Sequence, residues 1–243
     1  MPGTEPIEIA HDGARLRGVL VRSMGDGPAG EGPFPTVLVL HSGVGLYDFY
    51  RDKAVELAAL GYLAVAPNLF DASVDLTRPD SYGAAYMGLM ENPAQLRARL
   101  AAWLAVVAAR AEVDAARIAA IGYCFGGHCA LELARSGADL RAFVSYHGTL
   151  KTSAPATPGT VRGHVAAYCG AEDPYAPMDD VIALRQELEA AGAAYSLQVF
   201  GGVAHSFTDP HADRHDHPGI RYDPLAAKLS WTGTLALLEE VLA

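Results

Sequence analysis

Short runs of apolar and β-branched residues recur along the chain and alternate with longer segments of helical spacing. The short runs contain few polar residues, which is typical of parallel strands that are buried on both faces. These predicted strands are residues 36–43, 62–70, 116–123, 140–148, 163–174 and 194–202. The longer segments repeat apolar residues every three or four positions, and several end at a glycine, as helices do. These predicted helices are residues 48–62, 93–113, 125–137, 177–192 and 224–242.

The N-terminal pattern is different and predicts an antiparallel hairpin. Two apolar segments, 7–9 and 16–21, flank Asp12-Gly13, a dipeptide that is typical of tight hairpin turns. Beyond residue 36, the alternation of strands and helices predicts a mainly parallel central sheet with helices on both faces. The chain shows no internal repeat and no linker, so residues 1–243 are expected to form a single α/β domain.

Three stretches are expected to interrupt this pattern. Residues 24–35 are rich in glycine and proline and predict a surface loop. Pro67 is expected to break the strand at 62–70, because proline has no N–H group for the sheet. Residues 71–93 are expected to be irregular.

Composition and charge exclude several classes of protein. With 243 residues, of which 51% are hydrophobic, the chain is long enough to bury a full core. Its net charge is −10 and it has no basic run, so neither nucleic acid nor a membrane is an expected partner. We expect a monomer or homodimer that acts on a small molecule. The sparse cysteines, and the lack of a leader-like or membrane-spanning segment, predict a cytoplasmic location.

The most informative motif lies where a predicted strand turns sharply into a helix. Residues 122–126 read Gly-Tyr-Cys-Phe-Gly, which matches the nucleophile elbow G-x-S-x-G with cysteine in place of serine. Such a turn raises the nucleophile above the sheet at a helix N-terminus, whose partial positive charge favours a thiolate. The backbone N–H of Phe125 would face a developing oxyanion. The alternative is that Cys124 is a buried structural thiol.

Two further residues lie at or just beyond the ends of predicted strands and complete a candidate catalytic set. Asp173 and His205 come after Cys124 in the order nucleophile, acid, histidine, which is the chain order of the α/β-hydrolase triad. The carboxyl ends of parallel strands meet at one edge of a sheet, so the three side chains are expected to lie together. Glu172 competes with Asp173, although Pro174 restrains the backbone of Asp173. His205 has the alternative of being a hydrogen-bonded loop histidine.

The motifs "GYCFGG", "GAEDPY" and "GGVAHSFTDP" resemble the dienelactone hydrolase family (carboxymethylenebutenolidases) of α/β-hydrolases. The resemblance extends from about residue 36 to the C-terminus. It implies an α/β-hydrolase fold and cofactor-independent hydrolysis of an ester or lactone through a thioester acyl-enzyme. It also implies that Cys124 is the nucleophile, His205 the base and Asp173 its orienting acid. The backbone N–H of Gly43 would be a second oxyanion donor beside that of Phe125.

The chain also departs from the pattern of well-known family members. These members carry a glutamate near the cysteine, where this chain has Ser42, and an arginine four residues after the histidine, where it has Asp209. The arginines hold the substrate carboxylate. The segment 81–90 has no arginine either, although Arg78 lies nearby. We therefore expect uncharged esters or lactones to be better substrates than an anionic dienelactone.

The missing glutamate also bears on the resting state of the nucleophile. The resemblance implies that this glutamate helps to keep the thiol protonated until substrate arrives. Because Ser42 cannot accept a proton in that way, we expect Cys124 to rest as a thiolate paired with His205.

Other residues complete the expectations. The candidates for substrate binding lie in segments next to the predicted site: Ser42, Tyr86, Tyr123 and His147. Phe49 and Tyr82 are further aromatic candidates. Cys129 and Cys169 are expected to pack in the core. His211, His215 and His217 leave zinc binding open as an alternative to a polar surface loop, although no metal is expected. A non-catalytic or regulatory small-molecule binder with the same fold is the alternative to an enzyme.

Overall fold

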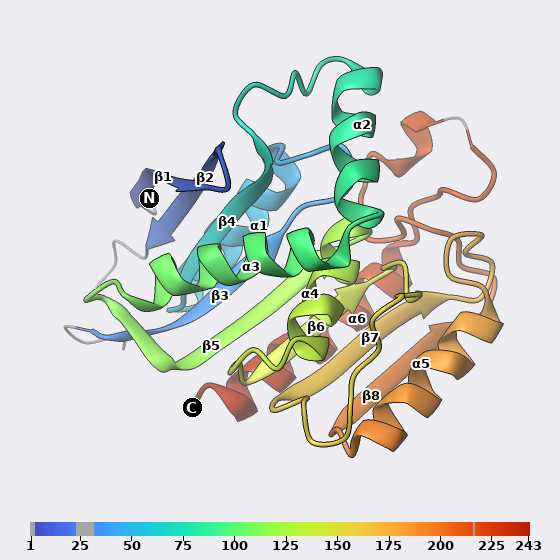
Figure 1. Cartoon of the computed structure of the whole chain (residues 1–243). Helices are drawn as coiled ribbons and strands as arrows, with labels where there is room; N and C mark the ends of the chain where they lie inside the picture. Colours follow the sequence, from blue (N-terminus) through green and yellow to red (C-terminus); the bar gives the residue numbers. More distant parts are fainter. Residues whose placement is uncertain (1–2, 23–31, 216) are drawn as a thin grey trace.

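A single eight-stranded sheet forms the centre of the computed structural model, which describes residues 3–22, 32–215 and 217–243 (Figure 1). Its strands are β1 (Gly3–His11), β2 (Ala14–Arg22), β3 (Phe34–Leu40), β4 (Leu63–Asp71), β5 (Val113–Tyr123), β6 (Ala142–Tyr146), β7 (His164–Gly170) and β8 (Tyr195–Phe200). They lie in the order β1-β2-β4-β3-β5-β6-β7-β8. Strand β2 pairs antiparallel with β1 and β4, and all other neighbours are parallel. The predicted hairpin and the mainly parallel sheet are both confirmed.

Helices cover both faces of this sheet. They are α1 (Asp48–Ala59), α2 (Pro79–Met90), α3 (Pro93–Ala108), α4 (Phe125–Arg135), α5 (Met178–Ala191) and α6 (Pro224–Val241). In Figure 1, α3, α4 and α5 lie in front of the sheet, and α1 and α6 lie behind it. Successive residues of β3 point to opposite faces: Leu38 and Leu40 join the core under α3 and α4, whereas Val37 and Val39 join the core under α1 and α6. The prediction of helices on both faces is confirmed.

Two sequence predictions about interruptions are wrong. Strand β4 runs through Pro67. Pro67 pairs with Gly18 of β2 at the end of the regular register, next to a register shift, and the pairing with β3 has already ended at Val65, so the missing N–H of proline falls at the end of both ladders. The segment 71–93 contains the helix α2, whose only buried residue is Leu89. Its two glycines and its small buried surface hid the helical pattern.

The remaining boundaries differ in smaller ways. Helix α3 ends at Ala108, and the last residue of its predicted range, Val113, begins β5. A short 3₁₀ helix, η1 (Ala212–His215), lies in a segment without a predicted element. Of the predicted loop at 24–35, residues 24–31 lie outside the described residues and Phe34 already belongs to β3. None of the helices in the described parts of the chain is both long and apolar enough to cross a membrane.

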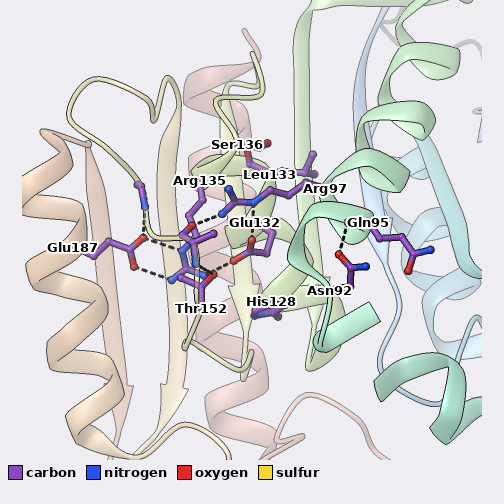
Figure 2. A network of polar contacts seen from close by, with 12 residues as sticks. Asn92, Gln95, Arg97, His128, Glu132, Leu133, Arg135, Ser136, Thr152 and Glu187 are labelled. Carbon is purple, nitrogen blue, oxygen red and sulfur yellow. Dashed lines mark hydrogen bonds and ion pairs between the residues drawn. The ribbon is translucent and has the colours of Figure 1, made fainter. Parts of the chain in front are cut away.

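A buried network of ion pairs joins α3, α4 and α5 (Figure 2). Glu132 of α4 is fully buried and pairs with Arg97 of α3 at 2.7 Å and with Arg135 at 3.0 Å. Arg135 also binds both carboxylate oxygens of Glu187 on α5, at 2.9 and 2.8 Å. Each buried charge thus faces an opposite charge, as burial requires.

Candidate active site

Cys124 stands on a strained turn between β5 and α4. Its backbone has a φ of 55°, in the left-handed region that a side chain disfavours. Two glycines allow this turn. A Cβ at Gly122 would lie 1.9 Å from the carbonyl oxygen of Gly126, and one at Gly126 would lie 2.1 Å from that of Leu40. Only glycine therefore lets the strand and helix approach closely enough to raise the cysteine above the sheet.

Asp173 and His205 meet at the same edge of the sheet. Asp173 follows β7, His205 follows β8, and His205 Nδ1 lies 2.8 Å from Asp173 Oδ2. Asp173 Oδ1 accepts a second hydrogen bond from the N–H of Tyr175 at 2.8 Å, so both carboxylate oxygens are held. With Nδ1 donating to the carboxylate, Nε2 is free to serve the thiol.

The structure brings Asp173, and not Glu172, to the histidine. The side chain of Glu172 is 62% exposed and lies 4.0 Å from Arg221. The loop of His205 is fixed from the other side, because its N–H donates to Gly219 at 2.9 Å and its carbonyl accepts from Arg221 at 3.0 Å. The histidine is therefore held by its backbone as well as by its ring.

The thiol and the imidazole change each other's protonation. Burial favours the neutral thiol of Cys124, but the positive charge of His205 and a hydrogen bond from it favour the thiolate. Hydrogen bonds from the backbone N–H groups of Gly43 and Phe125 act in the same direction, so the pKa of Cys124 lies below its ordinary value. Burial alone would lower the pKa of His205, yet Cys124 and Asp173 outweigh it and raise that pKa to about 10.

The loop after β3 directs one of these two N–H groups at the sulfur. His41 is fully buried, its Nε2 accepts from the N–H of Leu69 at 2.9 Å, and its Nδ1 therefore donates to the carbonyl of Ser42 at 2.7 Å. The N–H of Gly45 donates to the same carbonyl at 3.0 Å. Because the carbonyl and N–H of one trans peptide point in opposite directions, fixing the Ser42 carbonyl also fixes the Gly43 N–H.

A cavity of about 290 Å³ opens above Cys124. It contains all four predicted substrate-binding residues in its wall, and it is lined by Ser42, Gly43, Val44, Tyr47, Phe49, Tyr50, Tyr82, Gly83, Tyr86, Tyr123, Cys124, His147, Thr149, Tyr175, His205, Ser206, Thr208, Asp209 and Ile220. Neither lysine nor arginine is among them. In Figure 1, α2 and the segment before α6 both lie beyond the same end of the parallel strands, and each contributes residues to the lining.

Several residues of this wall were missed at the level of sequence. Tyr47 precedes α1, and its hydroxyl donates to Asp209 Oδ2 at 2.7 Å, across 162 positions of the chain. Tyr50 lies on α1, and the ring of Tyr175 packs edge-on against that of His205, 4.8 Å between centroids. Tyr175 had a usable signal, since it comes two residues after Asp173. Tyr47 had none, because its partner Asp209 is remote in the chain, and no motif marked Tyr50.

Some side chains near the motifs belong elsewhere. Arg78 is exposed and pairs with Asp80 at 2.6 Å, outside the cavity wall. Cys129 and Cys169 are buried in the core, which confirms their prediction, and burial raises the pKa of Cys169 to about 12. Among the described residues, no group of three or more histidine, cysteine or acidic side chains is placed to hold a metal ion. The side chain of His215 is outside this description, so the zinc alternative stays untested.

An α/β sheet with a cysteine elbow after β5 and an acid and a histidine after β7 and β8 defines the class of α/β-hydrolases. Comparison with known proteins narrows the class. The family model described as "Dienelactone hydrolase family" matches residues 21–242. The chain belongs to the dienelactone hydrolase family, and it is therefore a hydrolase.

Solved structures resemble the chain over nearly its whole length, and a curated relative resembles it over part of its length. The structure of m3DLH is 37% identical, covers 100% of this chain and 99% of its own, and has a TM-score of 0.91. The structure of a dienelactone hydrolase-like promiscuous phosphotriesterase from metagenomic libraries is 31% identical and has a TM-score of 0.89. The match covers 99% of this chain and 98% of the phosphotriesterase chain. An uncharacterised protein of Caenorhabditis elegans is 34% identical over 61% of this chain and 96% of its own.

Proposed function

We propose that this protein hydrolyses carboxylic esters or lactones through Cys124, with His205 and Asp173 as its proton relay. The observation that carries the proposal is the joining of three features at one sheet edge. A cysteine on a strained elbow faces a histidine, and that histidine is held by a buried carboxylate at 2.8 Å. A cysteine with a purely structural role would need neither the strain nor the lowered pKa that this thiol has.

The arrangement supports a two-step reaction. The Cys124 thiolate attacks the carbonyl carbon, and the negative charge moves to the carbonyl oxygen, which the N–H groups of Gly43 and Phe125 would stabilise. The imidazolium of His205 gives its Nε2 proton to the departing alkoxide, which leaves a thioester. His205 then removes a proton from water, the water attacks the thioester, and the acid and the thiolate are released.

The cavity supports substrates without a carboxylate. An anion would enter a wall whose described residues include the carboxylate of Asp209 and neither lysine nor arginine. Desolvating a carboxylate without a counter-charge is costly. A neutral ester or lactone meets no such penalty, so the substrate class is expected to differ from an anionic dienelactone.

Turnover of phenyl acetate by the wild type and by Cys124→Ala tests the proposal. We expect the substitution to abolish hydrolysis and to leave the circular dichroism spectrum unchanged, because it removes one sulfur atom at the surface of the cavity. Mass spectrometry of the wild type quenched during turnover should detect an added acetyl group on Cys124. Equal turnover by both proteins would refute the mechanism, and no turnover of any ester or lactone would favour the binding-protein alternative.

A neutral phosphotriester is a second candidate substrate. It has no negative charge to be repelled, and the phosphotriesterase from metagenomic libraries resembles this chain over 99% of its length. In the same assay, release of 4-nitrophenol from diethyl 4-nitrophenyl phosphate should depend on Cys124 if this activity is present.

A further inference from the structure

The carboxylate of Asp209 is the fixed charge of the cavity wall. The residue is 8% exposed and lines the cavity together with Cys124 and His205. Its Oδ2 accepts from the Tyr47 hydroxyl at 2.7 Å, and its Oδ1 accepts from the N–H of His211 at 2.8 Å. Each oxygen keeps a second lone pair for another donor, because a carboxylate accepts about four hydrogen bonds in all.

Neither partner of this carboxylate neutralises its charge. No lysine, arginine or histidine forms an ion pair with Asp209 in the described parts of the chain. Burial raises the pKa of Tyr47 far above its ordinary value, so the hydroxyl remains a neutral donor. Buried charges in proteins are normally paired, so an unpaired carboxylate in a ligand cavity suggests that the counter-charge comes with the ligand.

The other charges of the cavity do not supply this counter-charge. Cys124 and His205 carry opposite charges when they form a thiolate and an imidazolium, and together they add nothing to the net charge. Among the described lining residues, Asp209 is the only acidic side chain, and none is lysine or arginine. The carboxylate of Asp209 therefore has no basic side chain of the wall to balance it.

The rest of the wall has the chemistry that accommodates organic cations. Rings of Phe49, Tyr82, Tyr86 and Tyr175 belong to the lining, and Tyr82 and Tyr86 come from α2, which covers the site. Aromatic faces attract ammonium groups, and they tolerate the methyl groups that such a cation carries. A carboxylate together with several aromatic rings is a combination that selects an organic ammonium ion over a carboxylate or a metal ion.

We propose that this cavity prefers esters bearing an ammonium group, and that Asp209 is the residue that sets the preference. The proposal rests on the ester hydrolase function proposed above and specifies its substrate class. The competing explanation is that Asp209 only folds the loop, since its bond to the N–H two residues later also shapes the turn before η1. The two explanations differ in whether the charge of Asp209 affects substrate choice.

The test compares two acetate esters of equal shape, those of choline and of 3,3-dimethylbutan-1-ol. We expect the wild type to hydrolyse the choline ester with a kcat/KM at least tenfold higher. In Asp209→Asn, which retains a polar group of the same shape, this ratio should fall to about one. Tyr47→Phe should keep a ratio above one, because it removes a hydrogen bond and no charge. Glu172→Gln, which removes an exposed charge outside the cavity, should leave the ratio unchanged.

The outcomes decide two questions separately: whether the cavity prefers an ammonium group, and whether Asp209 sets that preference. A wild-type ratio of one or less overturns the ammonium preference whatever the variants do, including a variant that fails to fold. An equal ratio in wild type and Asp209→Asn assigns Asp209 to loop structure and overturns its role. If neither ester is hydrolysed, calorimetric binding of choline and of 3,3-dimethylbutan-1-ol to Cys124→Ala still measures the preference. Tighter binding of choline would then support the preference even though the hydrolase proposal had failed.

Discussion

At the scale of single residues, the protonation state of Cys124 is set by opposing influences. Burial favours its neutral form, whereas His205 and two backbone N–H groups favour the thiolate and prevail. Asp173 contributes indirectly, because its hydrogen bond stabilises the protonated form of His205. The place of the family's glutamate is taken by Ser42, which cannot hold a carboxylate charge beside the sulfur. The pair should therefore already be ionised before substrate binds.

The pH dependence of alkylation tests this ion pair. Because the pKa of Cys124 is lowered, iodoacetamide should inactivate the enzyme at near-maximal rate at neutral pH and more slowly as acid protonates the thiolate. Hydrolysis should rise with pH through that lowered pKa and fall again as His205 loses its proton near pH 10. In His205→Gln, burial remains as the largest influence on the Cys124 thiol, so its pKa should rise and alkylation should require a higher pH than in the wild type. An ordinary thiol profile in the wild type would contradict the ion pair.

The assignment of the acid is tested by a pair of neighbouring substitutions. Asp173→Asn should reduce kcat by roughly 10³-fold, because the amide no longer stabilises the imidazolium or its orientation. Glu172→Gln is the matched control and should change kcat little, since that side chain is exposed. Steady-state kinetics on phenyl acetate measure both. The reverse pattern would transfer the role of the acid to Glu172.

At the scale of elements, α4 connects the reactive edge of the sheet to the core. Its first residue, Phe125, supplies an N–H to Cys124, and its later turns carry Glu132 and Arg135 of the buried ion network (Figure 2). Arg135 also donates to the carbonyl of Leu150 at 2.8 Å. Leu150 is next to Thr149, which lines the cavity. The network therefore holds both the nucleophile helix and one wall of the site.

Removing one charge from this network should destabilise the fold. Glu132→Gln leaves Arg97 without its carboxylate and weakens the buried pair with Arg135, at a cost of about 3 kcal/mol in free energy of unfolding. Glu56→Gln is the control at the partly exposed pair with Lys53 and should cost less than about 1 kcal/mol. Urea denaturation followed by circular dichroism measures both. Equal midpoints for the two variants would show that the network contributes no more than a surface pair.

At the scale of the whole molecule, the site exists only at the carboxyl edge of the sheet. Loops after β3, β5, β7 and β8 bring Gly43, Cys124, Asp173 and His205 to that edge, and α2 covers it from one side. The loop of His205 is secured by the segment before α6 through residues 219 and 221. Distant parts of the chain thus meet in one cavity at this edge of the sheet.

The sequence by itself determined the features that depend on local chemistry. Apolar periodicity predicted most strands and helices. Asp12-Gly13 predicted the hairpin, and the glycines at 122 and 126 predicted the elbow. The order of cysteine, acid and histidine, each after a predicted strand, was enough to predict that they meet, because parallel strands end at the same edge. These conclusions needed only neighbours in the chain and the general geometry of α/β sheets.

The tertiary structure alone decided the features that depend on remote neighbours. The sequence favoured Asp173 over the adjacent Glu172 because Pro174 restrains its backbone, but only the folded turn after β7 places the Asp173 carboxylate 2.8 Å from His205 and leaves Glu172 exposed. The sequence of α2 has only a weak helical pattern, and its role became clear only in the folded chain, where its residues line the cavity. The bond between Tyr47 and Asp209 spans 162 positions, and no local pattern encodes it. Substrate choice depends on such contacts, because a cavity is formed by side chains that only folding brings together.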